Sequence, residues 1–367
     1  MSRSETESAI EQESFSLQIP KKKGQTAIQL LTTLSLLNRR LAPQTVDNIL
    51  HIPLSRKPLA EDQRRLQREL GELALSHERF PSRTQGAISL DEALSQTLPS
   101  NIASVVSKSF DIIGDIAIIE LSAKSKPFER IIADALMKVH KNIKAVYSKD
   151  GPISDIQRLR PLHHILGTNR TETIHKELGC RFKIDISKAF FSPRLSTEHS
   201  RVAEQVRPGE CVVDMFAGVG PFSILIAKRL KDIRVHAIDA NPDAVKLANE
   251  NVRLNKVQGR ITVWAGDARV IVKNNLSGAA TRVIMNHPSH AREFLEEACQ
   301  ALRREGGIVH YYTFADGPNS ESKASKEFVD GIRDFGWKIE RIVETRKVRG
   351  VAPVKWQVAV DARLELA

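Results

Sequence analysis

The stretch that decides the fold is Cys211-Val-Val-Asp-Met-Phe-Ala-Gly-Val-Gly-Pro-Phe-Ser-Ile-Leu-Ile-Ala-Lys-Arg-Leu230. Its first four residues form a short apolar run typical of a buried strand, and Pro221 suits the first turn of a helix. Between them lies the loop Asp214–Gly220, in which Gly218 and Gly220 let the backbone approach a ligand closely. The pattern predicts a strand, a ligand-binding loop and a helix in succession.

Alternation of strand-like and helix-like segments continues from this stretch to the C-terminus. The predicted strands are 234–239, 261–264, 282–286 and 307–313, the predicted helices are 242–254, 291–302 and 323–335, and two last strands fit 337–344 and 355–364. Such alternation is typical of a doubly wound, Rossmann-type α/β sheet, here with a closing β-hairpin.

The region before this alternation contains two small α+β modules. In the first we predict a tail at 1–14, strands at 15–20 and 49–54, a helix at 25–37 that stops at Asn38, and a helix at 61–75; a linker follows at 76–103. In the second we predict a strand at 110–120 with a Gly turn, a helix at 130–140, and strands at 145–147, 162–166 and 181–186. The expected domains are therefore 1–95 (with tail and linker), 104–185 and 186–367.

Composition limits the class of protein and its partners. The 367 residues carry a formal net charge of +11, which favours a polyanionic partner, with nucleic acid the first candidate. No apolar run is long enough for a membrane helix, the N-terminus lacks the apolar core of a signal peptide, and the three cysteines show no metal-type or disulfide spacing. We expect a cytoplasmic protein that binds neither a membrane nor a metal ion, and we take a monomer as the expectation.

Acidic residues at three strand ends point to the cofactor. Asp214 opens the glycine loop, where a carboxylate would repel a phosphate but attract the ammonium group of S-adenosylmethionine. Asp239 ends the next strand, where it can accept the ribose hydroxyls, and Asp267 follows the third strand, near the expected adenine. The alternative is that these carboxylates only cap helices. The expected fold is thus a Rossmann-type class I methyltransferase domain preceded by two small α+β domains.

The fourth strand ends in Asn286-His-Pro288, a rigid turn beside the expected methyl donor. Amino-methyltransferases use such a turn to hold a planar nitrogen substrate. The alternative is an Asn-initiated turn without a chemical role.

Three segments resemble the archaeal and eukaryotic tRNA (guanine37-N1)-methyltransferase family. They are Phe190-Phe-Ser-Pro-Arg-Leu-Ser-Thr-Glu198, Asp214-Met-Phe-Ala-Gly-Val-Gly-Pro-Phe222 and Val283-Ile-Met-Asn-His-Pro288. The resemblance covers nearly the whole chain and is loosest in the first domain, which in this family touches the outer corner of tRNA. Two positions depart from the family: His287 replaces a Leu or Pro, and Phe190 replaces a common Tyr. His287 either tunes substrate choice or faces solvent.

Methylation of guanine N1 requires its proton to leave and the charge on O6 to be stabilised, for which a carboxylate base and a guanidinium are suited. The resemblance implies that Glu198 is the base, that Arg158 faces O6, and that Asn286 holds the guanine edge while Pro288 shapes the turn. Two alternatives stay open: Glu198 is merely an acid in the first turn of a helix, and Arg158 contacts a phosphate.

The positions of the strand ends, the resemblance and the basic residues together give the other expected contacts of the site. The residues expected to bind S-adenosylmethionine are Phe190, Asp214, Phe216, Gly218, Gly220, Asp239, Asp267 and Asn286. The residues expected to bind RNA are Lys188, Arg194, Arg346 and Arg349, the last two on an exposed hairpin loop between the final strands.

N1-methylation of guanosine 37 in tRNA is the leading functional hypothesis. One alternative is the related aminocarboxypropyl transferase of wybutosine synthesis, and another is a bifunctional relative that also methylates a wyosine intermediate. A hypothesis of a different class is a tRNA-binding protein that keeps the cofactor fold without catalysis.

Overall fold

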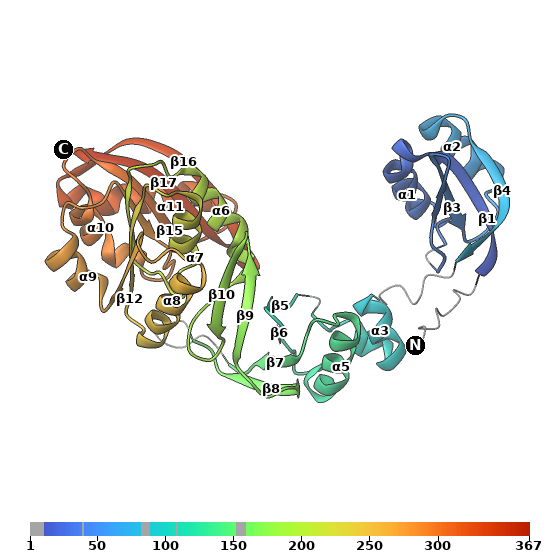
Figure 1. Cartoon of the computed structure of the whole chain (residues 1–367), viewed down its shortest axis with the longest axis horizontal. Helices are drawn as coiled ribbons and strands as arrows, with labels where there is room; N and C mark the ends of the chain where they lie inside the picture. Colours follow the sequence, from blue (N-terminus) through green and yellow to red (C-terminus); the bar gives the residue numbers. More distant parts are fainter. Residues whose placement is uncertain (1–10, 39, 82–88, 108, 152–158) are drawn as a thin grey trace, which may run out of the picture. The chain divides into compact units, whose positions relative to one another are not determined.

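The computed structural model describes residues 11–38, 40–81, 89–107, 109–151 and 159–367 (Figure 1). These form two compact units, Met1–Ala93 and Leu94–Ala367, each described by itself below. None of the helices in the described ranges combines the length and the apolar character needed to span a membrane.

Over its described residues up to Pro81, the first unit is an antiparallel sheet of strand order β2-β3-β1-β4 with two α-helices. Its elements are β1 (Glu11–Pro20), α1 (Gly24–Thr33), β2 (Gln44–Val46), β3 (Ile49–Leu54), α2 (Ala60–Leu70) and β4 (Ala74–Pro81). Leu17, Leu31, Ile52 and Leu66 are wholly buried in one apolar cluster, so this unit has a core of its own.

Both helices of this unit are shorter than the sequence predicts. The helix expected to stop at Asn38 ends at Thr33, because Ser35 takes a left-handed conformation and Leu36 N bonds back to Leu31 O. The helix expected at 61–75 ends at Leu70 with Gly71 as its cap.

The predicted linker at 76–103 is wrong in its described part. It contains most of β4 and two helices, α3 (Leu90–Thr97) and α4 (Ser100–Ala103). The end of the predicted tail is also ordered as the start of β1, whereas residues 1–10 lie outside the described ranges.

The second unit begins with a sheet of strand order β5-β6-β7-β8. Its elements are β5 (Asp111–Ile113), β6 (Ile116–Ile119), α5 (Glu129–Val139), β7 (Ala145–Lys149) and β8 (Leu162–Gly167). The predicted Gly turn is Gly114, with φ of 59°, and a Cβ there would lie 2.1 Å from Thr173 Oγ1, so this position requires glycine.

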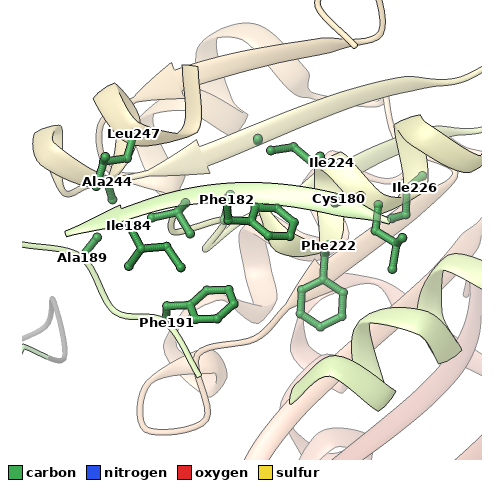
Figure 2. Packing of buried hydrophobic residues seen from close by; sticks show 14 of the residues in the cluster. Cys180, Phe182, Ile184, Ala189, Phe191, Phe222, Ile224, Ile226, Ala244 and Leu247 are labelled. Atoms are coloured by element: carbon green, nitrogen blue, oxygen red, sulfur yellow. The ribbon is translucent and has the colours of Figure 1, made fainter. Parts of the chain in front are cut away.

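A two-stranded hairpin follows, β9 (Glu172–Glu177) and β10 (Cys180–Asp185). Side chains of β10 share one buried cluster with those of α7 (Pro221–Arg229) and α8 (Pro242–Leu254), as Figure 2 shows. Asn251 Oδ1 accepts from Lys183 N at 2.6 Å, and Asn251 Nδ2 donates to Lys183 O at 3.0 Å. Asn255 binds both backbone groups of Arg181 in the same way. Asn251 of α8 and its C-cap residue Asn255 thus bond to the edge of β10 that faces away from β9, as a neighbouring strand would.

The C-terminal part is the predicted Rossmann-type fold: a seven-stranded sheet of order β13-β12-β11-β14-β15-β17-β16. The first five strands of this order are parallel, and β17 and β16 are antiparallel to their neighbours. The strands are β11 (Cys211–Asp214), β12 (Arg234–Asp239), β13 (Ile261–Ala265), β14 (Arg282–Met285), β15 (Gly307–Asp316), β16 (Trp337–Ala352) and β17 (Lys355–Leu366). The further helices are α6 (Ser196–Gln205), α9 (Ala268–Ile271), α10 (Leu295–Ala301) and α11 (Ser320–Ile332).

Each face of this sheet carries its own core, because successive side chains of a strand point to opposite faces. Val212 and Tyr312 belong to the cluster that contains α7 and α8, whereas Val213 and Tyr311 belong to the cluster that contains α10 and α11. The sheet is therefore covered on both sides, as a doubly wound fold requires.

The closing hairpin differs from the prediction. The stretch Arg346–Arg349 lies inside β16, paired with β17, and not on an exposed loop. The two strands extend to Ala352 and Lys355, so the turn lies farther along the chain than the sequence suggests. A register shift between Lys347 and Arg349 places Arg349 opposite Gln357.

Candidate functional site

The glycine loop joins β11 to α7. Gly218 and Gly220 have φ of 55° and 88°, and a Cβ on Gly220 would lie 3.1 Å from Ile224 Cδ1. Gly218 N donates to Asp239 Oδ2 at 2.7 Å, which ties the loop to the end of the neighbouring strand β12. Pro221 begins α7, as expected from the sequence.

A cavity of about 270 Å³ lies at the carboxyl ends of β11, β12, β13 and β14. It is lined by residues that directly follow or end these four strands, together with the segment before α6. Six of the predicted cofactor residues line it: Phe190, Phe216, Gly218, Asp239, Asp267 and Asn286. In a doubly wound sheet this edge is where ligands bind.

Asp214 and Gly220 lie behind the loop and are not among the lining residues. The side chain of Asp214 is wholly buried, and Oδ2 accepts from Ser223 Oγ at 2.8 Å. Oδ1 has no hydrogen-bond partner among the described residues. Burial raises the pKa of Asp214 to about 7, so a cation bound over the loop would favour its charged form.

Asp239 faces the cavity with both carboxylate oxygens already oriented. Oδ1 accepts from Asn241 N at 2.9 Å and Oδ2 from Gly218 N. Burial raises the pKa of this carboxyl, and each oxygen keeps a further lone pair for a hydroxyl group.

Asp267 combines two roles. Its carboxylate caps α9 by accepting from Arg269 N at 2.8 Å and pairs with the Arg269 guanidinium at 3.2 Å. The helix-cap interpretation therefore holds for this residue, which also lines the cavity. Arg269 in turn stacks on the Phe294 ring at 4.0 Å, and Phe294 meets Phe216 edge to face.

The turn after β14 forms one wall of the cavity. Asn286 Oδ1 accepts from Gln357 Nε2 at 3.0 Å. His287 is buried, lines the cavity and packs edge to face on Phe216 at 5.1 Å, so the alternative that it faces solvent is wrong. Pro288 is buried beside it but does not line the cavity.

Glu198 lies in the first turn of α6 and is 2% exposed. Oε1 accepts from Tyr312 Oη at 2.7 Å and from Arg201 Nη2 at 2.6 Å. Oε2 accepts from Arg201 Nε at 3.1 Å, and Arg346 Nη1 lies 3.6 Å from it. Glu198 does not line the cavity, but its neighbours Leu195 and His199 do.

Arg201 begins a buried chain of polar contacts that crosses one face of the sheet. It pairs with Asp361, which accepts from His310 Nδ1 at 2.7 Å. His310 Nε2 accepts from Arg282 Nη1 at 2.8 Å, and Arg282 pairs with Glu210. Burial alone would raise the pKa of Asp361, but His310 and Arg201 together hold it well below its usual range.

A second cavity adjoins the first and shares Phe190, Phe191 and Ser192 with it. Its polar lining includes Asp111, Glu120, Lys149, Arg160, Arg194 and Arg349, and therefore comes from both the β5–β8 sheet and the C-terminal part. Arg158, the predicted partner of O6, lies outside the described residues.

The four residues predicted to contact RNA differ in how many hydrogen bonds and ion pairs they already form with other residues of the protein. Arg194 donates to Asp111 at 2.6 Å and to Ser109 at 2.9 Å. Arg349 donates to Ser192 and Gln357, and Arg346 lies beside Glu198. Lys188 has the longest contact, 3.9 Å to Asp185, and its side chain is 54% exposed.

Sequence reasoning missed several residues of this site. Gln357 and Tyr312 come from strands far along the chain and carry no local signal. Arg201 could have been noticed, since it stands three residues after Glu198 on a helix, the spacing of neighbouring side chains.

A glycine loop and a carboxylate at adjacent strand ends of a doubly wound sheet are typical of a Rossmann-type domain, and the family match identifies this one as a methyltransferase domain. Residues 173–339 match the TRM5/TYW2 methyltransferase domain, and residues 90–171 match the TYW2 N-terminal domain. The chain belongs to the TRM5/TYW2 methyltransferase family.

Three known proteins illustrate this relationship. A Pyrococcus abyssi relative named tRNA (guanine(37)-N(1))-methyltransferase Trm5b is 37% identical over 95% of this chain and 99% of its own length. A Pyrococcus horikoshii relative named tRNA(Phe) (4-demethylwyosine(37)-C(7)) aminocarboxypropyltransferase is 32% identical over 77% of this chain and 99% of its own length. The protein in a solved complex of aTrm5 and tRNALeu is 31% identical in sequence. The structural match covers 95% of this chain and 99% of that chain, with a TM-score of 0.66.

Proposed function

We propose that this protein transfers the methyl group of S-adenosylmethionine to N1 of guanosine 37 in tRNA. The observation that carries the proposal is the pair of adjoining cavities that share Phe190, Phe191 and Ser192. One lies at the cofactor edge of the sheet, and the other is lined by cationic side chains suited to a polyanionic substrate. The relative named for this reaction matches almost the whole chain.

The first cavity fits S-adenosylmethionine in the chemistry of its lining. Asp239 would accept the ribose hydroxyls, Phe216 and Phe294 would border the adenine, and the buried charge of Asp214 would favour the ammonium group. When bound, the cofactor supplies an electrophilic methyl group. The six lining residues given above would hold it, with Gly220 shaping the loop from behind.

Glu198 is the proposed base for the N1 proton. Tyr312 and Arg201 hold Oε1 in place, whereas Oε2 has fewer donors and faces Arg346. In the proposed reaction Arg346 moves aside and Oε2 takes the proton from guanine N1. Arg158 is proposed to stabilise the charge that develops on O6, and Pro288 to fix the turn that carries Asn286.

A second candidate is aminocarboxypropyl transfer, which the match of residues 90–171 to the TYW2 N-terminal domain favours. The relative named for that reaction covers 77% of this chain, against 95% for the methyltransferase. The longer match includes the first unit, and this favours methyl transfer. A bifunctional enzyme would show both a methylated guanosine and a methylated wyosine intermediate.

Further features belong to the same proposal. We propose that Lys188, Arg194, Arg346 and Arg349 contact RNA, that the domains are 1–95, 104–185 and 186–367, and that the enzyme is a cytoplasmic monomer. Light scattering of the purified protein, alone and with tRNA, tests the oligomeric state.

The function is tested by nucleoside mass spectrometry of tRNA after incubation with methyl-labelled S-adenosylmethionine. We expect a labelled N1-methylguanosine with a G37 transcript and none with an A37 transcript. An aminocarboxypropyl product, label at another position or the absence of transfer would each contradict the proposal. Thermal stabilisation by the cofactor without any transfer to tRNA would indicate a site that binds but does not react.

A further inference from the structure

A row of hydrogen bonds links the two cavities through a buried glutamine. Ser192 Oγ accepts from Arg349 Nη1 at 2.9 Å, and Arg349 Nε donates to Gln357 Oε1 at 2.9 Å. Gln357 Nε2 then donates to Asn286 Oδ1 at 3.0 Å. Ser192 lines both cavities, Arg349 lines the second and Asn286 lines the first.

The direction of this row is fixed by chemistry. A guanidinium can only donate, so the Gln357 atom that faces Arg349 must be its oxygen. The Gln357 group that faces Asn286 is then the NH2 group. Because this group can only donate, the Asn286 atom that accepts from it must be the side-chain oxygen. Among the described residues none accepts a hydrogen bond from Asn286 Nδ2, so this group can donate to a ligand.

Gln357, at the centre of the row, is wholly buried, so these hydrogen bonds are not contacts between mobile surface side chains. It lies on β17 directly opposite Arg349 on β16, next to a register shift that brings the two side chains together. Burying an amide is costly unless both of its ends are bonded, and here both ends are.

We propose that Arg349 and Gln357 are positioning residues that hold the Asn286 amide with its nitrogen toward the substrate base. Asn286 then donates to a carbonyl oxygen, so the site selects a base with a carbonyl edge and disfavours one that presents an amino group there. This inference rests on the proposed function, and for guanine the acceptor is O6.

Two variants of Gln357 separate positioning from a structural role. In Q357E one carboxylate oxygen keeps the bond to Arg349, and the other forces Asn286 to turn its nitrogen away from the substrate. Q357M removes both bonds and leaves Asn286 free to take either orientation. We expect kcat to fall roughly 100-fold in Q357E, as for loss of one preorganised donor, and less in Q357M, with little change in KM for tRNA.

If Gln357 had only a structural role, kcat would fall more in Q357M than in Q357E. Q357E keeps the side-chain shape and the bond to Arg349, whereas Q357M loses both hydrogen bonds. A larger loss in Q357M, with a matching loss of thermal stability, would overturn the proposal. N286D, which presents only oxygens, is expected to lose as much kcat as Q357E.

A tRNA with inosine at position 37 identifies the atom that Asn286 contacts, because inosine keeps O6 but lacks the exocyclic amino group. We expect Q357E to lose the same factor with inosine as with guanosine. A loss confined to guanosine would show that Asn286 accepts from the amino group, and the proposal would be wrong.

A third measurement does not depend on activity. In protein with 15N-labelled Asn and Gln, the side-chain NH2 signal of Asn286, assigned by its absence in N286D, is expected to exchange rapidly with water. In Q357E it should become hydrogen-bonded and exchange slowly. If the signal is protected in the wild type, the orientation is wrong; if the orientation holds but G37 is not methylated, only the proposed function fails.

Discussion

At the scale of single residues, the proposed function gives the reacting group to Glu198 and the positioning to the residues that enclose it. Glu198 is enclosed by Tyr312, Arg201 and Arg346, which come from three different elements. A carboxylate held this way keeps one geometry, and under the proposed function Oε2, which has fewer donors than Oε1, takes the substrate proton. Its position in the first turn of α6 is compatible with the helix N-terminus as well as with catalysis.

Glu198→Gln is expected to lower kcat by about 10²- to 10⁴-fold, because it removes a general base while keeping the shape of the side chain. Affinity for cofactor and tRNA should be retained in equilibrium binding measurements. Glu204→Gln, on the same helix but exposed and bonded to Ser200, is the matched control. A wild-type turnover number for Glu198→Gln would refute its assignment as the base.

Asp214 gives a pH-dependent prediction for the cofactor-free protein. Its pKa is raised by burial from 3.8 to about 7, so between these values the folded protein binds a proton that the unfolded chain has lost. Stability from this group is therefore complete below about pH 4 and lost as the pH rises to 7. Relative to Asp214→Asn, the wild type should lose roughly 4 kcal/mol of unfolding free energy between pH 4 and pH 8.

Urea unfolding at a series of pH values measures this difference. The exposed Asp243→Asn on α8 is the control and should follow the wild type across the range. If the difference in unfolding free energy between the wild type and Asp214→Asn did not change with pH, Asp214 would be charged in the folded protein over the whole range.

Much of the cofactor cavity could be predicted from residues next to strand ends, because the carboxyl ends of parallel strands meet at one edge. Phe216, Asp239 and Asp267 follow that rule. Gln357 and Tyr312 could not be found in this way, since their contacts depend on the register of β15 and β17 and not on nearby residues.

At the scale of elements, the β10 edge depends on side chains instead of a strand. Asn251 is wholly buried and binds both backbone groups of Lys183, and its Nδ2 also donates to Val219 O at 3.1 Å. These bonds attach the hairpin β9–β10 to the glycine loop through α8. The hairpin leads directly to the segment that carries Phe190 and Ser192, so its attachment affects the site.

Asn251→Ala should therefore destabilise the protein by about 3 kcal/mol, because it leaves buried N–H and C=O groups without partners. Chemical unfolding compares it with Asn249→Ala, an exposed position on the same helix, which should stay within about 0.5 kcal/mol of the wild type. Equal stability of the two variants would show that water replaces the lost bonds.

The parallel strands and the helices α7 and α8 were predictable nearly to the residue, since buried parallel strands are continuous apolar runs and both helices begin with a proline. The later helices were not: α9 was missed, α10 begins only at Leu295, and α11 runs from Ser320 to Ile332 instead of 323–335. Strands β4 and β9 were missed because Ala74–Pro81 and Glu172–Glu177 are mostly polar and largely exposed. The early end of α1 was missed because apolar residues continue through the turn at helical spacing.

At the scale of the whole molecule, the chain combines a self-contained first unit with a second unit that holds both cavities. Because the first unit has its own core and none of its described residues lines either cavity, its role under the proposed function is tRNA binding. This agrees with the resemblance of its sequence to a domain that touches the outer corner of tRNA.

Removal of residues 1–93 should raise KM for tRNA at least several-fold and leave kcat at saturating tRNA close to that of the full chain. Steady-state kinetics with full-length tRNA and with an isolated anticodon stem-loop test this. The stem-loop, which lacks the outer corner, is expected to react alike with both proteins. An unchanged KM for full-length tRNA would mean that the first unit has another role.

The buried chain from Glu198 through Arg201, Asp361, His310 and Arg282 to Glu210 also constrains how this enzyme can evolve. Each member satisfies the charge or hydrogen bond of the next, so a single replacement leaves an unpaired group in the interior. Neutral drift at these positions must proceed by paired exchange. Libraries aimed at a new acceptor base should therefore hold them constant and vary the walls of the second cavity.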